Sequence, residues 1–280
     1  MERKEIEIMF ENKMLEYLGC SIYYRIEIKE NADKWVIFLH GAGVDHRMFN
    51  EQVKIVPKEY NILLWDARSH GKSVPNTGVF SMKQLMDDLL KIMAIEKISK
   101  AVFIGQSMGG NLAQDIAYYY PEKILGLILI DCTNNTAKLS KTENLMLSFT
   151  KPMFKLYPWK TLVKQSADAC GLRQEVKEYV AECFFKIGKE ALIDILIEVT
   201  KCLHEDASYK IKVPFVLLCG EKDKSGNIRK IAKPWSDSEP NCTFHMISNA
   251  GHNSNQDNPD EVNAHINRFL INLSAFSTNN

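Results

Sequence analysis

One serine stands between glycines at a spacing that suits a nucleophile. The sequence Gly-Gln-Ser-Met-Gly-Gly places Ser107 two positions from both Gly105 and Gly109. An apolar run, Ala101–Ile104, precedes it, and a pattern with helical spacing follows. In a sharp turn between a strand and a helix, the serine hydroxyl is held clear of the sheet, and only glycine fits on either side. We therefore predict that Ser107 is a nucleophile.

A serine hydroxyl is a weak nucleophile unless a neighbouring base accepts its proton. Seven histidines are available, and His252 fits best because it follows the apolar run Thr243–Ile247. A loop that leaves the carboxyl end of a strand lies where ligands of open α/β sheets bind. His245 lies within that run and His265 in a helical stretch, so we expect both to be structural. His40, beside a tight turn, is expected to form a structural hydrogen bond.

The base needs an acceptor at its second nitrogen to fix its tautomer. Asp223 ends the sequence Gly-Glu-Lys-Asp that follows the apolar run Phe215–Cys219. The chain order is then serine, aspartate, histidine. Two alternatives stay open. Glu221 lies two positions earlier, and Asp131 follows another apolar run and reaches the same edge of the predicted sheet.

An acyl-transfer site also needs backbone amides that stabilise the charge developing on the carbonyl oxygen. Met108, directly after the serine, is one expected donor. The second is Ala42, in the sequence His-Gly-Ala-Gly that follows the run Trp35–Leu39. The polar stretch 66–73 follows another apolar run, and we expect it to brace a loop.

The elements around these residues alternate between two patterns. Short apolar runs are typical of strands that are covered on both faces, and the stretches between them have helical spacing. This alternation predicts an α/β fold with a mostly parallel central sheet of about eight strands, flanked by helices. The predicted strands are Ile6–Phe10, Ile22–Ile28, Trp35–Leu39, Ile62–Trp65, Ala101–Ile104, Leu125–Ile130, Phe215–Cys219 and Thr243–Ile247; the helical stretches are Met82–Ile95, Leu112–Tyr120 and Glu261–Leu273.

One segment interrupts the alternation. Residues 134–212 are helical in character, and a segment of this length is too long to be a structureless connection in a compact domain. We interpret them as a helical cap inserted into a core formed by residues 1–133 and 213–280; a missed strand is the alternative. Its helical stretches are Lys141–Phe149, Glu175–Phe185 and Glu190–Cys202. Its large apolar residues could line a pocket or pack the cap: Met146, Phe149, Met153, Phe154, Leu156, Tyr157, Trp159, Phe184 and Phe185.

The composition limits the kinds of molecule that the protein is expected to bind. The 280 residues include 35 basic and 35 acidic side chains, so no net charge attracts nucleic acid. We expect a small-molecule substrate. No apolar run is long enough for a membrane span. The seven cysteines show no Cys-x-x-Cys spacing and no secretion signal is seen, which favours reduced thiols and a cytoplasmic protein. The sequence carries no signal for an oligomeric state.

Five motifs in order resemble those of the α/β-hydrolase family, of its capped serine-hydrolase kind: HGAG at 40–43, DARSHGKS at 66–73, GQSMGG at 105–110, GEKD at 220–223 and AGH at 250–252. Ser69 replaces a glycine that is common in the second motif. Serine at 107, where some members carry aspartate, disfavours haloalkane dehalogenases and epoxide hydrolases. The predicted serine, histidine and aspartate need no metal or organic cofactor to hydrolyse an ester, and the apolar residues of 134–212 favour a small or medium, partly apolar one. A C–C bond hydrolase, an acyltransferase and a ligand-sensing protein are the alternatives.

Overall fold

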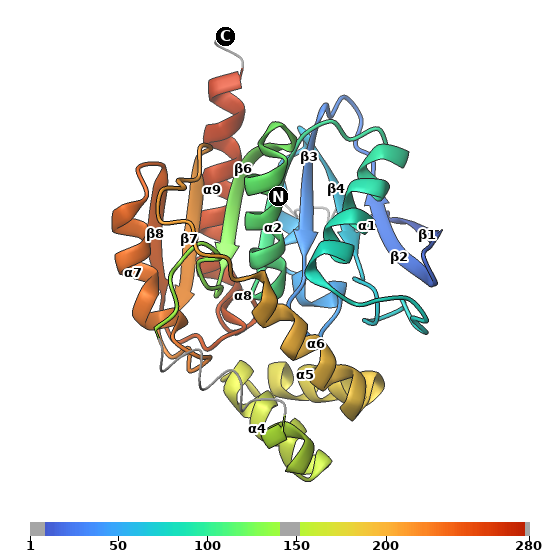
Figure 1. Cartoon of the computed structure of the whole chain (residues 1–280). Coiled ribbons are helices and arrows are strands. Elements are labelled where there is room, and N and C mark those ends of the chain that lie inside the picture. The colour runs from blue at the N-terminus through green and yellow to red at the C-terminus, as the bar shows by residue number, and fades with distance from the viewer. Residues whose placement is uncertain (1–8, 141–151, 278–280) are drawn as a thin grey trace, which may run out of the picture.

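The fold of this computed structural model, which describes residues 9–140 and 152–277, is built on one eight-stranded sheet (Figure 1). The strand order is β1-β2-β4-β3-β5-β6-β7-β8. β2 runs antiparallel to β1 and to β4, and all other neighbours are parallel. This arrangement confirms the predicted, mostly parallel sheet. The strands are β1 (Glu11–Tyr17), β2 (Cys20–Glu27), β3 (Lys34–Leu39), β4 (Tyr60–Trp65), β5 (Ala101–Gln106), β6 (Ile124–Ile130), β7 (Phe215–Gly220) and β8 (Cys242–Ile247).

The first strand differs from the sequence prediction. A strand was expected at Ile6–Phe10, of which residues 6–8 lie outside the described part; Met9 and Phe10 are not in a strand, and β1 begins at Glu11. β1 pairs with β2 alone and forms one edge of the sheet. Its side chains are exposed or half-buried. An edge strand of this kind needs no apolar alternation, and so its sequence lacks the signal that identifies the inner strands.

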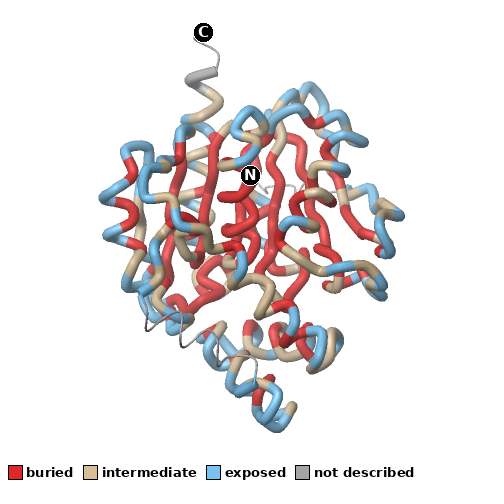
Figure 2. The backbone as a smooth tube through the Cα atoms, in the orientation of Figure 1, coloured by how far each residue is buried: buried red, intermediate tan, exposed pale blue. Residues whose placement is uncertain are grey.

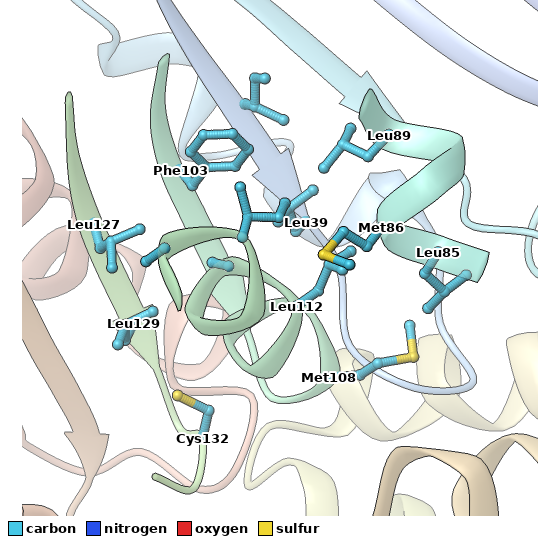
Figure 3. Packing of buried hydrophobic residues seen from close by; sticks show 14 of the residues in the cluster. Leu39, Leu85, Met86, Leu89, Phe103, Met108, Leu112, Leu127, Leu129 and Cys132 are labelled. Atoms are coloured by element: carbon cyan, nitrogen blue, oxygen red, sulfur yellow. The ribbon is translucent and has the colours of Figure 1, made fainter. Parts of the chain in front are cut away.

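Three helices cover one face of the sheet: α1 (Met82–Ile95), α2 (Met108–Tyr119) and α7 (Ile228–Ser238). Figure 3 shows Leu85 and Leu89 of α1 and Leu112 of α2 among apolar side chains of the strands. The spacing of three and four residues keeps such side chains on one side of a helix. α7 was not predicted, because it is short of apolar residues and contains Pro234.

The opposite face is covered mainly by α9 (Pro259–Ser277), through Val262, Ile266 and Leu270. These residues repeat every four positions and pack on strand residues that alternate with those of the first face. Both faces of the inner strands are therefore buried (Figure 2). Short helical turns complete the core: η1 (His46–Phe49), η2 (Val53–Ile55), η3 (Pro121–Lys123) and α8 (Ser254–Asp257).

Between β6 and β7, the described residues contain helices and no strand: α4 (Trp159–Cys170), α5 (Gln174–Ile187), α6 (Lys189–Val199) and η4 (Thr200–Cys202). We call residues 152–202 the helical insertion; in Figure 1 it projects below the carboxyl ends of the parallel strands. α5 and α6 coincide with two predicted helical stretches, whereas α4 was not predicted. The stretch Lys141–Phe149 lies outside the described residues. The division into core and cap stays a prediction.

No helix in the described ranges is both long and apolar enough to cross a bilayer.

Candidate active site

Ser107 occupies a strained turn between β5 and α2. Its φ of 49° and ψ of −115° are unfavourable for a residue with a side chain. The surrounding structure holds it there, since its amide donates to the Ile130 carbonyl at 2.9 Å. A Cβ on Gly105 would overlap the backbone of Gly109, and one on Gly109 would overlap the carbonyl of Leu39. The two flanking glycines are thus required by backbone packing.

The structure brings Ser107, His252 and Asp223 into one chain of hydrogen bonds. His252 Nε2 lies 3.0 Å from Ser107 Oγ, and its Nδ1 lies 3.0 Å from Asp223 Oδ2. The other oxygen of Asp223 accepts from the Ser225 amide at 2.7 Å. A carboxylate at Nδ1 keeps the proton on that nitrogen and leaves Nε2 free to accept the serine proton. This geometry is that of a nucleophile, a base and an orienting acid.

His252 is buried, and its surroundings act on its pKa in opposite directions. Burial lowers the pKa because it disfavours the imidazolium. The hydrogen bond and the charge of Asp223 raise it, as does the charge of Asp131, and together they outweigh burial. The pKa of His252 is therefore raised above its ordinary value, which means that the imidazole is stabilised once it has accepted a proton.

The two alternative acids occupy other positions. Glu221 binds the Asn249 amide at the surface and has no contact with His252 among the described residues. Asp131 is fully buried, and its oxygens accept from the amides of Gly220 at 2.7 Å and Ser254 at 3.0 Å. It therefore joins the loop that carries Asp223 to the loop that carries His252. Burial, and then the charge of Asp223, raise the pKa of Asp131 to about 7.

The predicted oxyanion donors have unengaged amides. Neither Ala42 nor Met108 donates a hydrogen bond to another described residue through its backbone amide. Met108 is the first residue of α2, where helical amides have no partner within the helix and the helix dipole is positive. The loop that contains Ala42 lies beside the serine, since a Cβ on Gly41 would be 3.5 Å from Ser107 Cβ.

Two buried histidines brace this loop, and a buried glutamine braces the loop of His252. His40 Nε2 accepts from the Ala67 amide, and His70 Nε2 accepts from the Gly43 amide, each at 2.9 Å. Burial lowers the pKa of both rings, to about 3 for His70, so both remain neutral acceptors. Gln106 donates to the His252 carbonyl at 2.8 Å. His70 lies in the stretch 66–73 that was expected to brace a loop, but neither its partner nor the role of Gln106 was predicted, because both bind backbone atoms distant in the sequence.

The stretch 66–73 is a buried brace, as expected. The guanidinium of Arg68 forms two hydrogen bonds of 2.6 Å with the Asp88 carboxylate, and both side chains are fully buried. Asp66 accepts from the His46 ring at 2.7 Å and from the Lys72 amide at 2.8 Å. Asp45, His46 and Asp66 lie close enough together to hold a metal ion, but protein donors already engage the Asp66 carboxylate.

The helical insertion covers the site from two sides. A Cβ on Gly43 would overlap Phe184 of α5 and approach Leu192 of α6, so both apolar side chains lie against the loop of Ala42. On the other side, Asp257 accepts from the amides of Gly251, Leu172 and Arg173 at 2.8 to 3.0 Å. This carboxylate joins the loop of His252 to the corner between α4 and α5.

Comparisons with known proteins agree with this architecture. A family model described as serine aminopeptidase, S33, matches residues 30–258. A 3-oxoadipate enol-lactonase of Acinetobacter baylyi is 31% identical over 123 residues, which cover 43% of this chain and 44% of the lactonase. The chain thus spans less than half the length of that curated relative. A putative esterase/lipase of Haemophilus influenzae is 24% identical over 93% of this chain and 92% of its own.

Solved structures share the fold over nearly the whole chain. A thermophilic esterase from Thermogutta terrifontis superposes with a TM-score of 0.77 at 19% identity, covering 94% of this chain and 99% of the esterase. An enol-lactonase from Burkholderia xenovorans gives a TM-score of 0.74 at 21% identity, with 92% and 100% covered. At these identities the likeness establishes the fold, which is that of the α/β hydrolases.

Proposed function

The chain belongs to the serine aminopeptidase S33 family of α/β hydrolases, and from this premise we propose that it cleaves a small or medium, partly apolar ester through an acyl-enzyme on Ser107. One observation carries the proposal. Ser107 Oγ lies 3.0 Å from His252 Nε2, while His252 Nδ1 lies 3.0 Å from Asp223. That arrangement activates a hydroxyl at neutral pH without a further group.

In the proposed reaction, His252 accepts the hydroxyl proton as Ser107 Oγ bonds to the ester carbonyl carbon. The carbonyl oxygen becomes an oxyanion, which the amides of Ala42 and Met108 stabilise. The tetrahedral intermediate collapses when the C–O bond to the alcohol breaks and His252 gives its proton to the leaving oxygen. Water then attacks the acyl-enzyme with His252 as base, which releases the carboxylic acid and restores Ser107.

The proposed substrate class follows from the surroundings of the loop of Ala42. Phe184 and Leu192 are buried against it and present apolar surface on the side of the helical insertion. We propose that the insertion serves as a cap and that these two side chains contact the apolar part of the substrate. The relatives named as enol-lactonase and as esterase/lipase support an ester, open or cyclic.

The test is a comparison of substrate classes with the wild type, Ser107→Ala and, as a matched control, Ser248→Ala at an exposed serine. We expect turnover of nitrophenyl esters and labelling by a fluorophosphonate probe for the wild type and the control, and neither for Ser107→Ala. The ester chain-length profile then defines the acyl site. Labelling without turnover of any ester or lactone would contradict the proposal, as would faster cleavage of aminoacyl nitroanilides than of esters.

We also propose a reducing, cytoplasmic compartment. All seven cysteines are free thiols, and five of them are buried. Disulfides form and persist in oxidising compartments and are rare in the cytosol. Counting the thiols that react with an alkylating agent after denaturation of protein taken directly from its native cells tests this, and seven are expected.

A further inference from the structure

The far end of the helical insertion carries large apolar side chains that face solvent. Leu156 is 85% exposed, Phe185 49% and Met153 48%, and Tyr157 is also exposed. Single exposed apolar residues are normal on a protein surface, whereas several at one end of a fold are typical of an interaction site. We call these four residues the tip patch.

Two sets of contacts join the two segments that contribute residues to the tip patch. The Lys189 ammonium donates to the carbonyls of Lys155 and Tyr157 at 2.7 and 2.8 Å, which fixes residues 155–157 beside the start of α6. The ring of Trp159 meets that of Phe185 edge-on, with centroids 5.9 Å apart. In Figure 2 the exposed end of the insertion lies far from the sheet.

The segment that carries most of the tip patch is rich in lysine. From Asn144 to Ala167 the sequence contains four lysines and no aspartate or glutamate, although the whole chain is neutral. Lys155, Lys160 and Lys186 are exposed, and none of them forms an ion pair with another described residue. Glu190, also exposed, is the acidic residue that follows the patch in α6. Lysines therefore outnumber acidic residues in this part of the chain.

Apolar, aromatic and lysine side chains together are typical of surfaces that rest on a membrane. Aliphatic and aromatic groups enter the headgroup boundary there, while lysines extend their charges to anionic lipids. Lysine is depleted in protein–protein interfaces, so its presence favours a lipid surface over a protein partner. We propose that the tip patch docks the protein on the surface of an anionic lipid bilayer.

Docking through this patch leaves the candidate active site in place. Phe184 and Phe185 are neighbours on α5, yet Phe184 is buried against the loop of Ala42 and Phe185 faces solvent. Successive helical side chains point in directions about 100° apart, so one helix can serve the site and the membrane with different sides. The proposal does not depend on the reaction proposed for Ser107.

The test measures co-sedimentation of the full chain, carrying Ser107→Ala to prevent lipid hydrolysis, with two kinds of vesicle. One kind is phosphatidylcholine alone, and the other contains phosphatidylglycerol as well. On this background we compare the apolar variant Leu156→Ser/Phe185→Ser and the charge variant Lys155→Gln/Lys160→Gln. The matched control is Ile28→Ser/Val79→Ser, at two apolar residues outside the helical insertion that are 62% and 70% exposed.

We expect the parent and the control to bind the anionic vesicles alike. The charge variant should bind them at least about tenfold more weakly, since one lysine near the surface contributes roughly fivefold. The apolar variant should show a loss of similar size. The substituted side chains are exposed or, like Phe185, about half exposed, so melting temperatures should stay within a few degrees of the parent, with the largest change where the contact of Phe185 with Trp159 is lost. Absence of parent binding to anionic vesicles, or equal binding by the parent and both tip variants, would overturn the proposal.

Discussion

Replacing Asp131 by asparagine should shift the pH dependence of hydrolysis. The Asp131 carboxylate raises the pKa of His252. One oxygen of Asp131 lies within 4.8 Å of one of Asp223, and His252 Nδ1 lies 3.0 Å from Asp223, so the charge of Asp131 is within about 10 Å of the imidazole. At that distance and an effective dielectric constant of about 20, two charges interact by about 2 kcal/mol, a little over one pKa unit.

The sign follows from which form of His252 reacts. A histidine that acts as base must be neutral, so kcat/KM is expected to rise with pH through the pKa of His252, which its surroundings raise above the ordinary value. Asparagine carries no charge and stabilises the imidazolium less. The midpoint of the acid limb should therefore fall in Asp131→Asn, by at most about one pH unit, because Asp131 carries its full charge only above its own pKa of about 7.

The assay is hydrolysis of a nitrophenyl ester from pH 5 to 9, followed where nitrophenol and nitrophenolate absorb equally. Asp115→Asn is the matched control, because Asp115 is a buried carboxyl whose pKa burial raises to about 6 and whose partners are Asn135 and His204. Its midpoint should equal that of the wild type. An unchanged or higher midpoint in Asp131→Asn would refute the reasoning.

The same substitution should also change stability, by an amount that depends on pH. Burial raises the pKa of Asp131 to about 7, so the ionised carboxylate destabilises the folded state above that pH, and asparagine removes this cost. Asparagine can accept from one of the two amides while its own NH₂ faces the other, and an unsatisfied buried donor costs about 1 to 3 kcal/mol in the free energy of unfolding. Denaturant titrations at pH 5 and pH 9 should therefore show a larger loss relative to the wild type at pH 5.

Three further predictions concern single side chains. Ser107→Ala should reduce ester turnover by at least about 10⁴-fold while leaving the melting temperature within a few degrees, as measured by steady-state kinetics and calorimetry. Asp88→Asn leaves the buried Arg68 guanidinium unpaired and should cost about 3 to 5 kcal/mol in urea titration, whereas the neighbouring Asp87→Asn should change stability by less than about 0.5 kcal/mol. Gly109→Ala places a methyl group on the Leu39 carbonyl and should prevent folding or cost more than about 3 kcal/mol, against about 1 to 2 for Gly226→Ala, whose surroundings are open.

Local patterns predicted most of the fold. Inner strands such as β5 and β7 are buried on both faces, so their sequences are continuous apolar runs that end at glycine. The same runs located the loops that carry Ser107, Asp223 and His252, because parallel strands end at a common edge. The structure brings these three side chains together; their catalytic roles stay predictions until they are tested.

Features that depend on distant backbone atoms could not be predicted. The sequence leaves Asp131 open as an alternative acid. Its hydrogen bonds from the amides of Gly220 and Ser254 form only when the carboxyl ends of β6, β7 and β8 come together. β1 is an edge strand without an apolar pattern, and α7 contains Pro234, so neither has a local signal. The apolar residues of the insertion were expected to line a pocket or to pack the cap. The structure instead divides them between the buried Phe184 and the exposed Leu156 and Phe185; Met146 and Phe149 lie outside the described residues.

The carboxylate of Asp257 limits how insertions could be exchanged between related hydrolases. It accepts from Gly251 in the loop of His252 and from Leu172 and Arg173 at the α4–α5 corner, so that corner and the loop are held by the same buried carboxylate. A chimera that imports foreign helices should therefore be spliced within α4 and within α5, with residues 170–173 retained. A chimera that replaced the corner as well would leave the buried Asp257 carboxylate, five positions from His252, without two of its amide donors. Turnover should then fall even if the new helices folded.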